Sequence, residues 1–154
     1  MSDAKAKGGQ GQFITVRIHN QLFGLPIATI HEVFVPEQIT RVKLSPPEVE
    51  GVLNLRGRIV TMIDMRRLLR LPERESTSLV AAGIDFHGES YGLIIDAVGE
   101  VLTVDGLSRQ SNPANMDPRW AELVAGVYRV SGELMLVLDV DRALRAVAPA
   151  LKAA

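Results

Sequence analysis

The sequence has no cysteine, only seven aromatic residues (one Trp, two Tyr and four Phe) and no long apolar run. The absence of cysteine excludes disulfide bonds and thiolate metal sites. No apolar stretch approaches the ~20 residues of a membrane-spanning helix, and residues 1–12 lack the apolar segment of a signal peptide. We therefore expect a cytoplasmic protein whose core is aliphatic rather than aromatic.

An excess of positive charge is also missing, since 17 Lys and Arg stand against 18 Asp and Glu. Binding to nucleic acid by counterion release, or to anionic lipid, needs clustered basic residues. A small barrel that binds oligonucleotides would also need stacking aromatics, so this function is only a remote alternative. We expect no nucleic-acid partner and no direct insertion into a membrane.

The chain contains an internal repeat, with two copies of one sequence motif. Residues 23–27 (FGLPI) match residues 91–95 (YGLII) at an offset of 68, and residues 49–52 (VEGV) match 124–127 (VAGV) at an offset of 75. The extra residues of the second copy fall near 108–118, where Pro, Asn and Ser predict a surface loop.

Each copy contains the same series of short apolar segments separated by polar or glycine-containing turns, which is typical of β-strands. The predicted strands are 13–18, 22–25, 32–35, 51–55 and 58–63 in the first copy, and 79–86, 90–94, 100–104, 126–130 and 133–138 in the second. Asp64 and Asp139 follow the last strand of each copy and are predicted N-caps of the short helices Met65–Leu69 and Val140–Ala148.

These patterns predict an all-β protein with two pseudo-symmetric, five-stranded β-barrel lobes and short helices, since closure removes exposed sheet edges. The expected organisation is a disordered polar tail at 1–11, a domain at 12–147 with lobes at about 12–75 and 78–147, and a C-terminal tail at 148–154. Exchange of strands between the lobes is left open.

No catalytic motif is found: the P-loop, GxGxxG, HExxH and GxSxG patterns are all missing. His19 and His87 share a repeat position in predicted turns, where they are expected to be polar turn residues rather than metal ligands. Trp120 is expected to cover the core. We predict no metal site and no cofactor.

Two pairs of carboxylates occupy matching repeat positions. Glu32 and Glu100 could form a glycosidase pair, but such an enzyme needs an aromatic-lined sugar cleft, so a hydrolase is a remote alternative and both are expected to face solvent. Asp64 and Asp139 are explained by helix capping. We therefore predict that the protein is not an enzyme.

Arg56 and Arg58 flank Gly57 at a predicted hairpin tip, where the second copy has Ser131 and Glu133. The difference could be random divergence of exposed residues. Alternatively, the basic tip docks on an acidic partner, since Arg is favoured in interfaces. The residues themselves leave both open.

Residues 51–66, GVLNLRGRIVTMIDMR, resemble the signature of CheW-like domains, G-V-x-N-L-R-G-x-I-x-P-h-x-D-L-R with h apolar. Thr61 stands where Pro is common and Met65 where Leu is common. Residues 23–33 and 91–102 are similar to two further stretches of this family, so the resemblance spans about residues 12–147. It implies two five-stranded barrel lobes in a scaffold that couples chemoreceptors to the histidine kinase CheA.

The resemblance also implies the partner surfaces. One surface would bind the CheA regulatory domain, and a groove between the lobes would hold the cytoplasmic hairpin tip of a chemoreceptor. The implied receptor-facing residues are Ile30, Glu32, Arg56, Val98 and Val101; Gly51 would lie towards the kinase, and Asn54 and Gly57 would shape the turn that presents Arg56. A stand-alone adaptor is expected in the cytoplasm, recruited to receptor arrays at the inner face of the membrane. The same adaptor in a non-flagellar chemosensory pathway, such as twitching or development, is left open.

Overall fold

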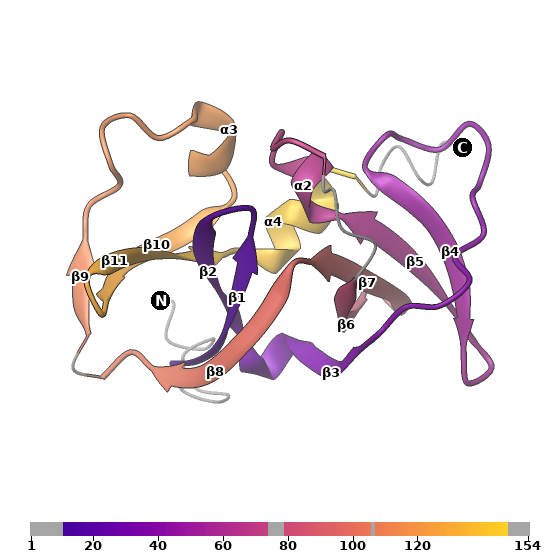
Figure 1. Cartoon of the computed structure of the whole chain (residues 1–154), viewed down its shortest axis with the longest axis horizontal. Coiled ribbons are helices and arrows are strands. Elements are labelled where there is room, and N and C mark those ends of the chain that lie inside the picture. Colours follow the sequence, from indigo (N-terminus) through magenta and orange to yellow (C-terminus); the bar gives the residue numbers. More distant parts are fainter. Residues whose placement is uncertain (1–10, 74–78, 106, 148–154) are drawn as a thin grey trace.

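The computed structural model describes residues 11–73, 79–105 and 107–147, most of which form β-strands (Figure 1). The predicted fold class, mostly β with short helices in a two-lobed arrangement, is confirmed. Both predicted tails lie outside the described residues, apart from Gly11.

Eleven strands are described. The first repeat copy supplies β1 (Gln12–Ile18), β2 (Gln21–Pro26), the 3-10 turn η1 (Ile27–Thr29), β3 (Ile30–Phe34), β4 (Val49–Leu55), β5 (Arg58–Asp64) and α2 (Met65–Leu68). The second copy supplies β6 (Val80–Phe86), β7 (Glu89–Ile95), β8 (Ala97–Thr103), β9 (Ser108–Gln110), α3 (Pro118–Ala121), β10 (Val124–Val130), β11 (Glu133–Leu138) and α4 (Val140–Arg145).

The strands form two sheets with the orders β8-β1-β2-β11-β10-β9 and β3-β6-β7-β5-β4. Each sheet mixes strands of both copies: β1 and β2 lie with β10 and β11, whereas β6 and β7 lie with β3, β4 and β5. Two parallel pairs, β2 with β11 and β5 with β7, join the copies. The ranges 12–75 and 78–147 therefore mark the two repeat copies, and neither range alone supplies all the strands of one sheet.

Both sheets curl until their edges approach. β8 and β9 stand at opposite edges of the six-stranded sheet, yet only residues 104–107 connect them. That link reaches at most about 18 Å, whereas six flat strands would be roughly 24 Å wide. In the five-stranded sheet, Thr40 follows β3 along the chain and bridges to Val52 on the opposite edge strand β4. Each lobe is therefore barrel-like.

The segment 108–118 differs from its prediction as a simple surface loop. Residues 108–110 form β9, which pairs with β10 and gives this sheet six strands instead of five. Asp117 caps α3 by accepting a hydrogen bond from the Arg119 amide at 2.8 Å, and Pro118 occupies the first helical position. The Asp-Pro dipeptide is a helix-start signal that the loop interpretation overlooked.

The predicted caps and turns are confirmed. Asp64 and Asp139 accept hydrogen bonds from the Arg66 and Arg142 amides at 3.0 and 3.1 Å. The helices end at Leu68 and Arg145, one residue and three residues before their predicted ends, Ala148 lying outside the described residues.

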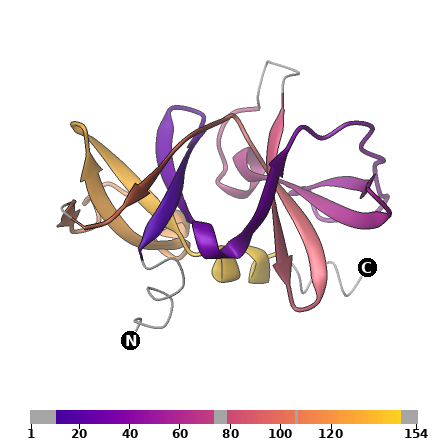
Figure 2. The same ribbon diagram turned by 90° about the horizontal axis from the view of Figure 1, so that it is seen from below.

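A single large core joins the two lobes. It combines side chains from both sheets with α4, which lies between the lobes (Figures 1 and 2). Its members include Val16, Ile18, Phe23, Leu25, Ile63, Ile84, Leu93, Ile95, Leu136, Leu138, Ala143 and Leu144. Trp120 covers it as predicted, with its ring 5.6 Å from that of Phe23 and its Nε1 donating to the Leu69 carbonyl at 2.8 Å. The interior between the lobes is therefore filled.

Candidate functional site

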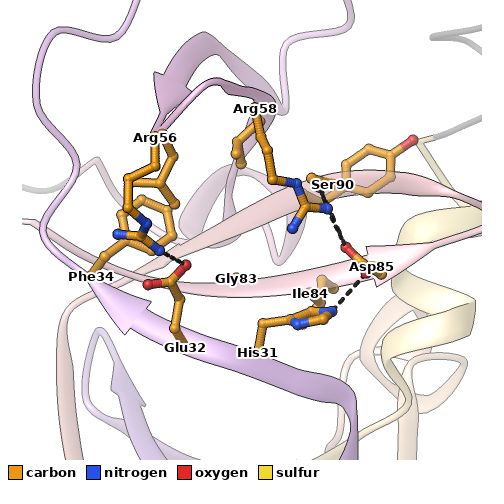
Figure 3. Close-up of a pocket in the computed structure, with 12 residues that line it drawn as sticks. His31, Glu32, Phe34, Arg56, Arg58, Gly83, Ile84, Asp85 and Ser90 are labelled. Atoms are coloured by element: carbon orange, nitrogen blue, oxygen red, sulfur yellow. Dashed lines mark hydrogen bonds and ion pairs between the residues drawn. The ribbon is translucent and has the colours of Figure 1, made fainter.

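A pocket of about 190 Å³ opens in the five-stranded lobe, between the β4–β5 hairpin and strands β3, β6 and β7 (Figure 3). Its apolar wall comprises Phe34, Leu55 and Val60, and its polar rim comprises His31, Glu32, Arg56, Arg58, Asp85 and Ser90, with Gly83 between them. Ile84 and Tyr91 also border the pocket, but their side chains belong to the core shared by the lobes. Val60 is buried, and Phe34 and Leu55 pack beside it. The pocket thus has an apolar floor below a charged rim.

The first side of the rim is set by the β4–β5 turn. Leu55 pairs with Arg58, which leaves Arg56 and Gly57 as a two-residue turn with φ of 54° and 88°. Positive φ at both positions is the type I′ geometry that fits a twisted hairpin. The Asn54 side chain stabilises the turn by accepting a hydrogen bond from the Gly57 amide at 2.8 Å.

This turn holds Arg56 over the pocket, where its guanidinium forms an ion pair with Glu32 on β3 (Figure 3). The Arg56 side chain is 67% exposed and that of Glu32 is 35% exposed. The cation is therefore the outer member of the pair and the group that an approaching partner meets first.

Asp85 organises the opposite side of the rim. Its Oδ1 accepts a hydrogen bond from Arg58 at 3.3 Å, and its Oδ2 lies 2.6 Å from His31 Nε2. Arg58 also donates to Ser90 Oγ at 2.5 Å. Burial opposes ionisation of Asp85, but the hydrogen bond with His31 and the charges of His31 and Arg58 lower its pKa below the ordinary value.

The apolar residues implied for receptor contact lie on two lobes. Ile30 pairs with Ile84 in the five-stranded lobe and packs on the edge of the shared core, as Val98 does from β8 in the other lobe. Val101 on β8 is 47% exposed, and its repeat counterpart Val33 is also exposed. Because the interior between the lobes is filled, a groove at this seam is confined to the surface.

Gly51 is buried on β4 and offers no surface of its own. A Cβ added there would collide with the Thr40 carbonyl oxygen and lie 2.8 Å from a methyl of Ile39. Gly51 therefore allows the chain after β3 to pack against β4. Nearby in the same loop, Val42 and Leu44 are exposed, Leu44 by 94%.

The carboxylates and histidines considered for catalysis do not assemble into a site. Glu32 pairs with Arg56, whereas Glu100 is exposed on β8 in the other lobe. His19 and His87 lie in turns with φ of 60° and 51°, which confirms their interpretation as turn residues. Among the described residues, no cluster of three or more potential metal ligands occurs. No helix in the described ranges is long and apolar enough to cross a membrane.

Asp85, Ser90 and Gly83 are not among the site residues predicted from the sequence. A signal was available, because each differs in charge or size from its repeat counterpart: Arg17, Leu22 and Thr15, respectively. Such divergence at matched positions of a duplicated sheet marks where the two lobes present different surfaces.

Comparison with known proteins gives a consistent result. The sequence profile of the CheW-like domain matches residues 12–148. The chemotaxis protein CheW of Klebsiella aerogenes is 30% identical over 139 residues, which cover 86% of this chain and 81% of that protein. The chemotaxis protein CheW of Treponema pallidum is 28% identical over 138 residues, with the same coverage of 86% and 81%. The crystal structure of the scaffolding protein TtCheW from Thermoanaerobacter tengcongensis superposes with a TM-score of 0.71 and 25% identity, covering 83% of this chain and 88% of that one.

Proposed function

Since this chain belongs to the CheW-like domain family, we propose that it presents its partners with two separate surfaces, one for the receptor and one for the kinase. The protein is a non-enzymatic chemotaxis scaffold that couples receptors to CheA. Its functional residues are therefore those that contact the partner proteins.

The proposed receptor surface is centred on Arg56. The single observation that carries this assignment is that the type I′ turn holds the Arg56 guanidinium outward, paired to Glu32 and more exposed than it. Ile30 lies beside this pair on β3, and Val98 and Val101 extend the surface onto β8. A helical receptor tip would place apolar side chains on the valines and isoleucine, while the charged pair selects its orientation.

The proposed kinase surface is the loop that Gly51 supports. Gly51 does not touch the kinase in this proposal; it lets residues 39 and 40 pack on β4, and this packing fixes the loop that follows. Val35, Val42 and Leu44 are exposed on that loop and form an apolar contact surface for the regulatory domain of CheA. We place the assembly in the cytoplasm at the inner face of the membrane, where the receptor tips would lie.

The receptor assignment is tested by pull-down with the cytoplasmic fragment of a chemoreceptor from the same cell. Arg56→Glu should weaken receptor capture while leaving the melting temperature and CheA capture close to wild type. Ile30→Asp should also weaken receptor capture and retain CheA capture, with a lower melting temperature but a folded protein, because Ile30 packs on the edge of the shared core. Arg129→Glu, the same charge reversal at an exposed site on β10, should leave receptor capture unchanged. Wild-type receptor capture by both variants would show that the receptor binds another face.

A further inference from the structure

The residues that form the pocket beneath Arg56 have different counterparts in the six-stranded lobe. The residues of the six-stranded lobe at the matching repeat positions include Leu22, Leu102, Val130 and Met135, and they pack into a small apolar cluster. Leu22 and Met135 are buried. In the six-stranded lobe, which we call the sealed lobe, apolar side chains thus occupy the position that corresponds to the pocket of the open lobe.

Smaller side chains at three matched positions accompany the opening, one of them Val60, where the six-stranded lobe has Met135. Thr15 in the sealed lobe corresponds to Gly83, and Leu22 corresponds to Ser90. The Thr15 hydroxyl fills the space next to β8 and donates to the Glu100 carbonyl at 3.0 Å. A Cβ on Gly83 would lie 3.6 Å from the Glu32 carbonyl oxygen, so the open lobe retains the same backbone arrangement without the side chain that would fill it.

The chemistry of the open pocket matches one apolar and one acidic side chain. Its floor is apolar, formed by the buried Val60 with Phe34 and Leu55 packed beside it. In both rim pairs the arginine is the more exposed member, Arg56 over Glu32 by 67% to 35% and Arg58 over Asp85 by 59% to 44%. An incoming partner therefore meets guanidinium groups first, and an acidic partner complements them.

We propose that this pocket is a subsite for a receptor helix: it receives one apolar side chain of the helix, while a carboxylate one helical turn away replaces Glu32 at Arg56. Residues three or four apart lie on the same face of a helix, so one helix can present both groups together. An apolar side chain inserted into a desolvated pocket and ringed by polar contacts is the usual composition of an interface hot spot. The inference rests on the proposed receptor docking at Arg56 and adds the pocket to it.

Gly83→Thr tests the proposal, because it installs the residue that the sealed lobe already carries. The added Cβ makes ordinary contacts of 3.4 Å or more with Phe34 and Glu32, and Gly83 is not among the residues with positive φ, so folding should be retained. Binding of the purified cytoplasmic fragment of a chemoreceptor to the full chain should weaken by about tenfold or more, and Gly83→Ala should have a smaller effect. Thr15→Val, at the matching position of the sealed lobe, should change affinity by no more than about twofold.

A second measurement follows the pocket directly. Methyl resonances of Val60 should shift when the receptor fragment is added to the wild-type chain, whereas the methyl resonance of Met135, the repeat counterpart of Val60, should not. If Gly83→Thr binds like wild type and the Val60 methyls do not respond, while Arg56→Glu loses binding, the pocket proposal is wrong and receptor docking at Arg56 stands. If Arg56→Glu and Gly83→Thr both bind like wild type, the docking proposal fails as well.

Discussion

Arg17 and Asp85 occupy the same position in the two repeat copies and carry opposite charges. Arg17 on β1 donates two hydrogen bonds to Glu133 on β11, at 3.0 and 2.5 Å. Asp85 on β6 accepts from Arg58 on β5 at 3.3 Å. Since Arg58 is the counterpart of Glu133, both lobes have an ion pair at this site with its polarity inverted. The fold thus accepts either polarity, provided that the two residues are complementary.

Reversing the charge of Arg17 should therefore be corrected by reversing its partner. Arg17→Asp places two carboxylates together and should lower the free energy of unfolding by about 1 kcal/mol, a small effect because both side chains are substantially exposed. Arg17→Asp combined with Glu133→Arg should recover most of that loss, as measured by chemical denaturation. If the double variant loses as much free energy of unfolding as the two single variants added together, complementary charge does not explain the stability of this pair.

The same pair predicts an acid-sensitive contribution to stability. The hydrogen bond from Arg17 lowers the pKa of Glu133 below its ordinary value of 4.5, with burial opposing and the Arg17 charge assisting. The folded state then binds fewer protons than the unfolded state, so the pair stabilises the protein above pH 4.5 and loses this contribution as the pH falls through the lowered pKa. Carboxyl NMR titration should show the lowered value in wild type and a return towards the ordinary value in Arg17→Gln. If the pKa of Glu133 is unchanged in that variant, Arg17 is not the cause of the lowered value.

Gly51→Ala should break the packing of the β3–β4 loop on β4. The added methyl would overlap the Thr40 carbonyl, and the φ of Gly51, 151°, is one that other residues rarely adopt. We expect a loss of about 2–3 kcal/mol in the free energy of unfolding together with weaker CheA binding.

Gly126→Ala is the matched control, because Gly126 is the repeat counterpart of Gly51. Its added methyl meets the flexible end of the Arg109 side chain at 3.3 Å, which can move aside. The cost should stay below about 1 kcal/mol. Equal losses in the two variants, measured by thermal or urea unfolding, would mean that the Thr40 contact is unimportant.

Most of the fold was predictable because its signals are local. Strand segments, the glycine turns and the capping residues Asp64 and Asp139 follow from neighbouring residues, and they were placed within a few positions of their observed bounds. The exchange of strands was not predictable in the same way. β5 and β11 are repeat counterparts with similar apolar patterns, so the sequence does not indicate that β2 pairs with β11 and not with β5.

The site was predictable only in part. Arg56 could be placed at a hairpin tip from Gly57, but its pairing with Glu32 depends on how β3 lies against the hairpin. The pocket forms because Gly83 on β6 and Ser90 on β7 lie next to residues of β3 and β5. These contacts are distant in sequence, so no local pattern predicts them. Gly51 was associated with the kinase surface through a family resemblance, whereas its burial shows that any effect of this residue must be indirect.

A largely buried ion pair joins the two lobes, and its removal should cost more than that of the rim pairs. Asp96 accepts from Arg66 of α2 at 2.5 Å and from the His19 amide of the β1–β2 turn at 2.7 Å, and the Arg66 and Asp96 side chains are only 15% and 18% exposed. Asp96→Asn preserves the shape but removes the negative charge that faces Arg66, so we expect a loss of about 2–3 kcal/mol in the free energy of unfolding. Asp85→Asn, the same change in an exposed pair, should cost less than about 1 kcal/mol. If urea denaturation gives similar losses for the two variants, burial does not set the strength of these pairs, and Asp96 does not hold the β1–β2 turn of one lobe to α2 of the other.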